Sequence, residues 1–152
     1  LWEALSMPFV PPGVTSMEDV LVPANPRRED FVESTWYWHP GSGAFVKALI
    51  PVACQGFFAF RAGAEVDSTP VYDGTLAPRP DVPLVGGWNL VGPPRDMPIE
   101  ALPVPDGLHV REVWAWDADF QLLYRVIAGE ILVRDRAYWV RCADTPCETC
   151  GP

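Results

Sequence analysis

The sequence predicts a mainly β protein built from two diverged copies of one β-rich unit, and three observations support this prediction. Proline accounts for 18 of the 152 residues. Because proline can neither donate to a strand ladder nor sit inside a helix, long regular elements are excluded. Hydrophobic residues make up 49% of the chain and charged residues only 20%, which suits a folded core. Finally, the same landmarks recur in both halves.

The internal repeat depends on four pairs of matching segments. A tryptophan-led strand, an acidic segment, a Trp-x-Trp strand and a closing aromatic strand follow one another in each half. The pairs are residues 2–8 with 88–93, 18–21 with 99–102, 36–38 with 114–116, and 57–59 with 138–140. Chance produces one such match far more readily than four in the same order.

Each unit is expected to contain a short strand, a short helix, a hairpin and a closing strand. Helix starts are predicted near Ser16 and Asp96, which are capping residue types. Hairpins are predicted at residues 35–46 and 113–124, where turn residues separate aromatic, β-favouring runs.

The chain therefore divides into four segments. They are a first β repeat (1–62), a proline-rich connector (63–86), a second β repeat (87–142) and a cysteine-containing tail (143–152). A unit of about 60 residues buries too little surface to be stable alone. We therefore expect the two units to pack face to face about a pseudo-twofold axis, as one sandwich or barrel-like unit.

The second unit resembles a repeat found in secreted and surface-attached bacterial proteins. Its motifs are GWNLVG at 87–92, VWAWD at 113–117 and AYWV at 137–140, against "GWNL", "VWAWD" and "GYWV" in the family. The first unit departs from this pattern, since residues 2–5 are degenerate and GFFA at 56–59 replaces the closing motif. The resemblance implies an extracellular, accessory, non-catalytic module, with no active site to carry over.

Charge and chain ends bear on partners and location. The net charge is −9, which argues against a nucleic-acid partner because phosphate binding needs a basic stripe. The chain has no run of about 18 apolar residues, so we expect no membrane insertion. It begins at Leu1 rather than Met, which indicates a processed chain or a fragment. The expected location is extracellular or at the cell surface.

The candidate ligand-binding residues are four tryptophans. Trp36 and Trp38 lie two positions apart in one predicted strand, as do Trp114 and Trp116, so each pair points to one face. Exposed indole rings would form a platform for a carbohydrate or a protein partner. The competing interpretation is a buried aromatic core shared by the two units. It is favoured, because aromatic side chains dominate the cores of small β domains.

The four cysteines permit three interpretations. Cys147 and Cys150 have the C-x-x-C spacing of a redox motif, but they lie in a tail and not at a helix start. Together with Cys54 and Cys142 they also have the composition of a four-thiolate zinc site. Disulfides that fasten the tail to the body are favoured, with one bridge from Cys54 and one within the tail.

No catalytic constellation is evident. His39 and His109 lack a nearby nucleophile and do not have metal-ligand spacing. Asp117 and Asp119 share a hairpin turn but lack the calcium-loop pattern. We therefore expect no enzyme, no catalytic residue, no metal and no cofactor.

Two functions compete. The first is a non-catalytic extracellular structural or assembly protein of a surface layer, filament or particle, which acts through protein–protein contacts or self-assembly. Its prolines and predicted disulfides suit that setting, because they restrict the unfolded chain. The alternative is a carbohydrate-binding accessory module that uses exposed tryptophans. The features that recur in both units are those that build a core or a contact surface, so the first function is favoured.

Overall fold

The computed structural model describes residues 2–8, 10, 13–17, 19, 35–60 and 82–144. These residues form two four-stranded sheets and one two-stranded ribbon, and every strand pairing is antiparallel. The mainly β fold class is therefore confirmed. Both large sheets are open, so the described part of the chain contains no closed barrel. Most of the predicted connector (63–86) and tail (143–152) lies outside the described residues.

The first sheet comes from the N-terminal half. Its strands are β1 (Trp2–Ser6), β2 (Thr35–His39), β3 (Ala44–Lys47) and β4 (Gly56–Phe60). They lie in the order β1-β4-β2-β3. β2 and β3 form the hairpin predicted at residues 35–46, and its turn ends at Gly43, where φ is +61°. This hairpin prediction is confirmed.

The second sheet comes from the C-terminal half. Its strands are β5 (Gly87–Val91), β7 (His109–Asp117), β8 (Leu122–Val126) and β10 (Tyr138–Ala143), in the order β5-β10-β7-β8. β7 and β8 form the second predicted hairpin. The two sheets have the same connectivity. In each, the strand that comes first in the sequence lies at one edge and pairs with the strand that comes last. That last strand also pairs with the second strand, which in turn pairs with the third at the other edge.

The two predicted helix starts have different outcomes. Near Ser16 the cap forms, because the Ser16 Oγ accepts a hydrogen bond from the backbone N–H of Asp19 at 3.3 Å. Near Asp96 the chain instead forms β6 (Met97–Pro98), which pairs with β9 (Ile131–Leu132), followed by the 3-10 turn η1 (Ile99–Ala101). The Asp96 carboxylate accepts from Arg134 N at 2.8 Å. The prediction that Asp96 caps a helix is therefore wrong, because its carboxylate holds the segment after β9.

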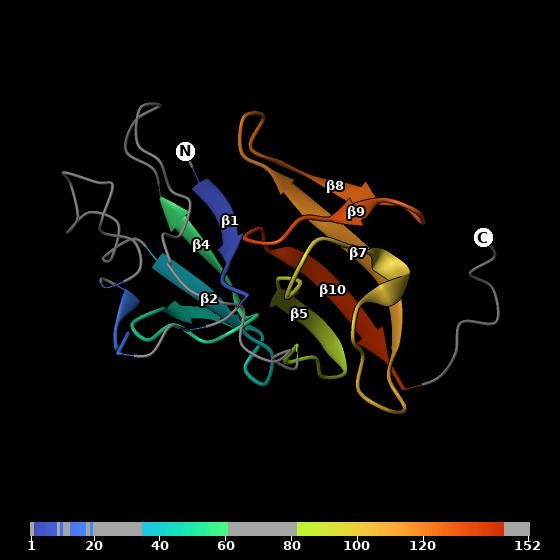
Figure 1. Ribbon diagram of the computed structural model, residues 1–152, viewed down its shortest axis with the longest axis horizontal. Coiled ribbons are helices and arrows are strands. Elements are labelled where there is room, and N and C mark those ends of the chain that lie inside the picture. Colours follow the sequence, from blue (N-terminus) through green and yellow to red (C-terminus); the bar gives the residue numbers. More distant parts are fainter. Residues whose placement is uncertain are drawn as a thin grey trace.

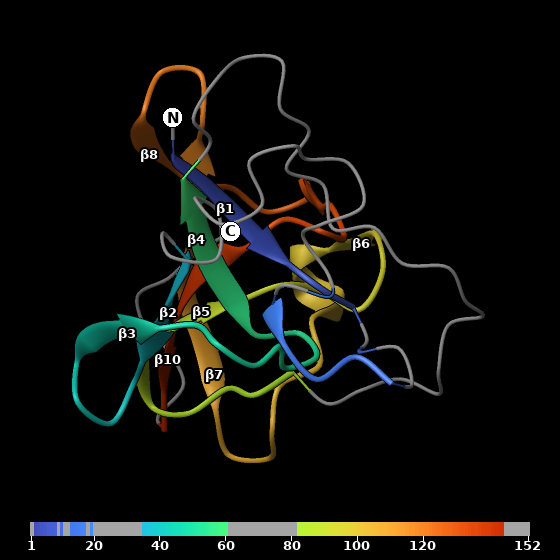
Figure 2. The same cartoon turned by 90° about the vertical axis from the view of Figure 1, so that its left-hand side faces the viewer.

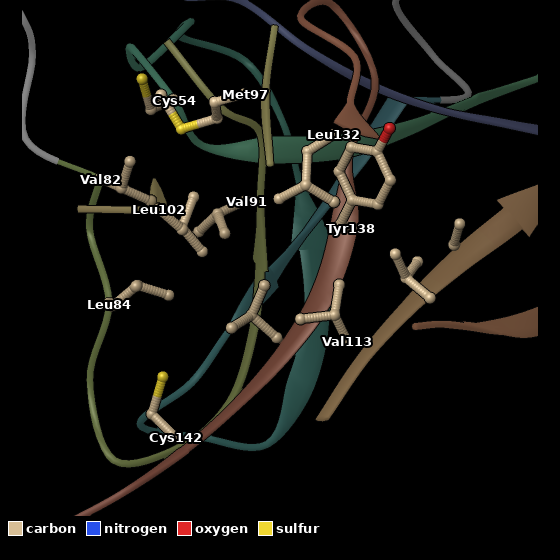
Figure 3. Close-up of a cluster of buried hydrophobic side chains, with 13 residues drawn as sticks. Cys54, Val82, Leu84, Val91, Met97, Leu102, Val113, Leu132, Tyr138 and Cys142 are labelled. Atoms are coloured by element: carbon tan, nitrogen blue, oxygen red, sulfur yellow. The ribbon is translucent and has the colours of Figure 1, made fainter. Parts of the chain in front are cut away.

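Each large sheet carries an aliphatic core on one face. The first core contains Leu5, Met7, Met17, Ala48, Phe57 and Ala59. Figure 3 shows the second and larger core, in which Val91, Val113 and Tyr138 meet Val82, Leu84, Met97, Leu102 and Leu132 from the covering segments. Because side chains alternate along a strand, Val113 and Ala115 face this core, and the tryptophans of β7 face the opposite side.

The faces opposite these cores pack against each other. Figure 1 shows the first sheet, coloured blue to green, beside the second, coloured yellow-green to red. In Figure 2 the first sheet lies in front of the second, so the two sheets form separate layers. The layer between them is aromatic.

Asn89 fastens the end of the connector to the second sheet. Its buried side-chain amide donates to the carbonyls of Val85 at 2.8 Å and Val140 at 3.3 Å. Its Oδ1 accepts from the backbone N–H of Val85 at 3.0 Å. Removing this amide takes hydrogen-bond partners from the part-buried N–H and C=O of Val85 and from the buried C=O of Val140. That loss exceeds the net value of a typical hydrogen bond.

We predict that Asn89→Ala lowers the free energy of unfolding by about 2–3 kcal/mol, because it removes all three of these hydrogen bonds, one of them fully buried. Chemical denaturation measures the change. Asp119→Ala, in an exposed turn, is the control and should change stability by less than about 0.5 kcal/mol. Equal effects of the two substitutions would contradict this role of Asn89.

Candidate functional site

The aromatic layer between the sheets consists of edge-to-face ring pairs. Trp38 packs on Trp139 with ring centroids 5.1 Å apart, and Phe58 packs on Trp116 at 5.7 Å. Phe45 also contacts Trp139, at 5.9 Å. Such pairs add about 0.5–1.5 kcal/mol each beyond the area that they bury. We call this layer the aromatic seam, defined by Phe45, Phe58, Trp38, Trp116 and Trp139.

Two indole hydrogen bonds cross the seam in opposite directions. Trp38 of the first sheet donates its Nε1–H to the carbonyl of Trp88 at 2.9 Å. Trp116 of the second sheet donates its Nε1–H to the carbonyl of Trp2 at 2.8 Å. Each tryptophan thus satisfies its polar atom on the opposite sheet, which fixes the position of one sheet relative to the other.

Backbone hydrogen bonds also cross between the sheets. Ser6 N donates to Asp135 O at 3.0 Å, and Gly92 N donates to Cys54 O at 2.9 Å. Both acceptor residues have a positive φ, 58° at Cys54 and 71° at Asp135. The approach is so close that a Cβ at Gly92 would lie 1.7 Å from Ser6 Oγ. Only glycine fits at this position.

We predict that Gly92→Ala destabilises the protein by about 2–3 kcal/mol, because the new methyl group overlaps Ser6 and forces the sheets apart. Thermal and chemical unfolding measure the change. Gly86→Ala is the control, since a Cβ there would meet only Asp144 Oδ1 at 3.7 Å. A Gly92→Ala protein as stable as the control would show that the sheets do not approach so closely.

A pocket of about 390 Å³ opens at one end of the seam, at the lower end of the range for ligand sites. Its lining residues are Trp38, Trp88, Glu112, Trp114, Leu123 and Trp139. They come from β2, β5, β7, β8 and β10. Strand register brings them together, because Trp139 pairs with Trp114 across β10 and β7. We call this site the tryptophan pocket.

Glu112 is the only ionisable group that the described residues contribute to the pocket lining. Its Oε2 accepts from Trp114 Nε1 and its Oε1 accepts from Arg141, both at 2.9 Å. These bonds, that of Trp114 first, hold the pKa of Glu112 below its ordinary value. The guanidinium of Arg141 also lies 5.9 Å from the ring centroid of Trp88. At the wall formed by Trp88, the Arg141 cation therefore already lies against an indole ring.

The structure separates the four candidate tryptophans. Trp38 and Trp114 line the pocket. Trp116 belongs to the seam, and Trp36 lies half-exposed outside the pocket lining. None of the four is fully buried, since Trp36 is exposed and the other three are partly buried.

Trp88 and Trp139 belong to the pocket but were not among the candidates. Both lie in the repeat motifs, GWNLVG and AYWV. Alternation in these two strands places them opposite the core residues Asn89 and Val140. This alternation of side chains along the strands is the sequence signal that identifies Trp88 and Trp139 as residues of the face opposite the core.

Cys54 and Cys142 are buried free thiols of the second core. Figure 3 places them at opposite ends of this cluster, so they do not form a disulfide with each other. No disulfide occurs among the described residues, and the predicted bridge from Cys54 is not formed there. Cys147 and Cys150 lie outside the described residues. Burial raises the pKa of Cys54 to about 11 and also raises that of Cys142.

We predict that neither buried thiol reacts with Ellman's reagent in the native protein at pH 8, where about one Cys54 in a thousand is ionised. Both should react after denaturation. The raised pKa of Cys54 also predicts that its contribution to stability is full below about pH 9, the unfolded pKa, and is lost as the pH rises toward 11. Fast native labelling of Cys54 would contradict its burial.

The remaining polar candidates have structural contacts. His39 Nδ1 lies 3.1 Å from Ser42 N within the β2–β3 turn. Asp117 Oδ1 accepts from the backbone of Asp119 and Phe120 in the β7–β8 turn. In the part of the chain that the structure describes, no three His, Cys, Asp or Glu residues are grouped to hold a metal ion.

Comparisons of the chain with family models, curated proteins and solved structures give no significant match. Within the described ranges, no helix is long and apolar enough to span a bilayer.

Proposed function

We propose that this protein is a non-catalytic structural or assembly component of an extracellular layer, filament or particle, and that it acts through protein–protein contacts. The observation that carries this proposal is the apolar edge strand β8. It is the last strand of the second sheet, so one side of its backbone has no neighbouring strand among the described residues.

Exposed apolar side chains concentrate at β8 and in the turn before it. Leu122, Leu123 and Tyr124 are 47%, 46% and 41% exposed, and Phe120 is 76% exposed. Natural proteins usually protect such edges with lysine, proline or a covering segment. Arg125 is the only charged residue of β8. An open apolar edge of this kind suits the addition of a strand from another chain.

We further propose that the second chain is another copy of this protein. β8 is five residues long, and antiparallel pairing of two copies about Tyr124 would place Arg125 opposite Leu123 of the other copy. Like charges therefore do not face each other. The pairing would join two four-stranded sheets into one continuous sheet and cover the apolar edge.

The proposal of an assembly protein is supported if the chain consists of two copies of one ancestral unit in a pseudo-twofold arrangement. The shared strand order, the reciprocal indole bonds of Trp38 and Trp116, and the paired backbone bonds of Ser6 and Gly92 support this arrangement. Of their partners, Trp2 and Trp88 match in the sequence alignment of the halves, and Cys54 and Asp135 each lie three residues before the aligned segments 57–59 and 138–140. The edge strand β3 of the first sheet then corresponds to β8. The extracellular location is proposed from the resemblance of the second unit to secreted repeat modules.

The expected behaviour is self-association that increases with concentration. Sedimentation velocity or light scattering should show dimers or larger species of the natural sequence. The double substitution Leu122→Lys and Tyr124→Lys should keep the chain monomeric, because the added charges oppose pairing of two β8 edges.

The matched control is Leu49→Lys, at an exposed apolar residue outside any strand. It should associate as the natural sequence does. A natural protein that stays strictly monomeric at high concentration would contradict the proposal. So would equal association of the β8 double variant and the natural sequence.

A further inference from the structure

In the tryptophan pocket, the ring of Trp139 stands nearly at right angles to the rings of Trp38 and Trp88. The ring planes of Trp38 and Trp139 meet at 72°, and those of Trp88 and Trp139 meet at 88°. A sugar ring usually stacks on one flat, exposed ring face. Perpendicular rings instead surround a compact group from several sides, as in the aromatic cages that hold quaternary ammonium groups.

We propose that the tryptophan pocket binds a methylated, quaternary ammonium group, held by the indole walls with Glu112 beside it. This inference does not depend on self-assembly through β8. The chemistry of the lining distinguishes such a cation from a neutral sugar in two respects, its hydrogen-bonding groups and its charge.

Three hydrogen-bonding groups of the lining, two indole N–H groups and the carboxylate, are already engaged. Trp38 Nε1 is bonded to Trp88 O, and Trp114 Nε1 is bonded to Glu112. Among the described residues, Glu112 is the only side chain of the lining that accepts hydrogen bonds, and each of its oxygens already accepts one. A sugar would bury several hydroxyls with few acceptors, which is unfavourable. A quaternary ammonium group has no N–H and needs no hydrogen-bond partner.

The electrostatics favour a cation. The faces of indole rings carry negative potential and attract cations within about 6 Å. Arg141 already uses Trp88 in this way, at 5.9 Å. The Glu112 carboxylate adds a negative charge at the wall, and the whole chain carries a net charge of −9. Arg141 is half-exposed, so a ligand cation competes with it for Trp88 and Glu112.

The test titrates the full chain with choline chloride and follows intrinsic tryptophan fluorescence or binding heat. The matched ligand is 3,3-dimethylbutan-1-ol, which has nearly the same shape without the charge. Choline should bind saturably and about three- to tenfold more tightly than the alcohol. Equal affinities, or binding of a neutral oligosaccharide without binding of choline, would overturn the proposal.

Variants locate the site. Glu112→Gln keeps the shape of the wall and removes its charge, so choline affinity should fall about three- to tenfold. Arg141→Gln removes the competing cation and should strengthen choline binding, which a merely structural role of Arg141 does not predict. Unchanged choline affinity in both variants would overturn the proposal.

Trp114→Leu removes one wall, and Trp36→Leu is its control, because Trp36 also lies in a strand but outside the pocket lining. Choline binding should be lost only in Trp114→Leu. Equal binding by the two variants would place the ligand elsewhere, against the proposal. Melting curves check folding, and Glu112→Gln keeps the test decisive if Trp114→Leu does not fold.

Phosphocholine and a trimethyl-lysine peptide then distinguish a lipid headgroup from a modified protein as the source of the quaternary ammonium group.

Discussion

The packing of two β-sheets across an aromatic seam is the interaction on which the rest of this structure depends. Neither sheet buries both of its faces by itself, since each has its aliphatic core on one side only. The other face of each sheet carries large rings, which would be exposed without the partner sheet. Burying those rings, together with two indole hydrogen bonds, makes the two halves one folded unit.

Several local features follow from this packing. Gly92 has no side chain because Ser6 of the first half occupies the space that a Cβ would take. The left-handed conformations of Cys54 and Asp135 allow their carbonyls to accept hydrogen bonds from the opposite half. The tryptophan pocket forms where the seam reaches the surface, so its walls are set by the same packing that stabilises the fold. Leu123 belongs both to that pocket and to the exposed edge β8, which places the two proposed binding surfaces side by side.

The sequence predicted the local elements better than the site. Both hairpins depend on residues near in sequence, and their turn and strand composition was sufficient to place them. At the second predicted helix start only the 3-10 turn η1 forms, and Asp96 does not cap it. Pairing of β6 with β9, which is distant in sequence, outweighed the local capping signal. The pocket combines Trp38 of one half with Trp139 of the other. No spacing within either half shows that contact, since it depends on how the sheets pack.

The account is tested most directly by the cooperativity of unfolding. Differential scanning calorimetry compares the calorimetric enthalpy with the van't Hoff enthalpy, and their ratio is close to one for a single cooperative unit. If the seam joins the two sheets, we expect one transition with a ratio close to one. Two separate transitions, one for each sheet, would contradict the account.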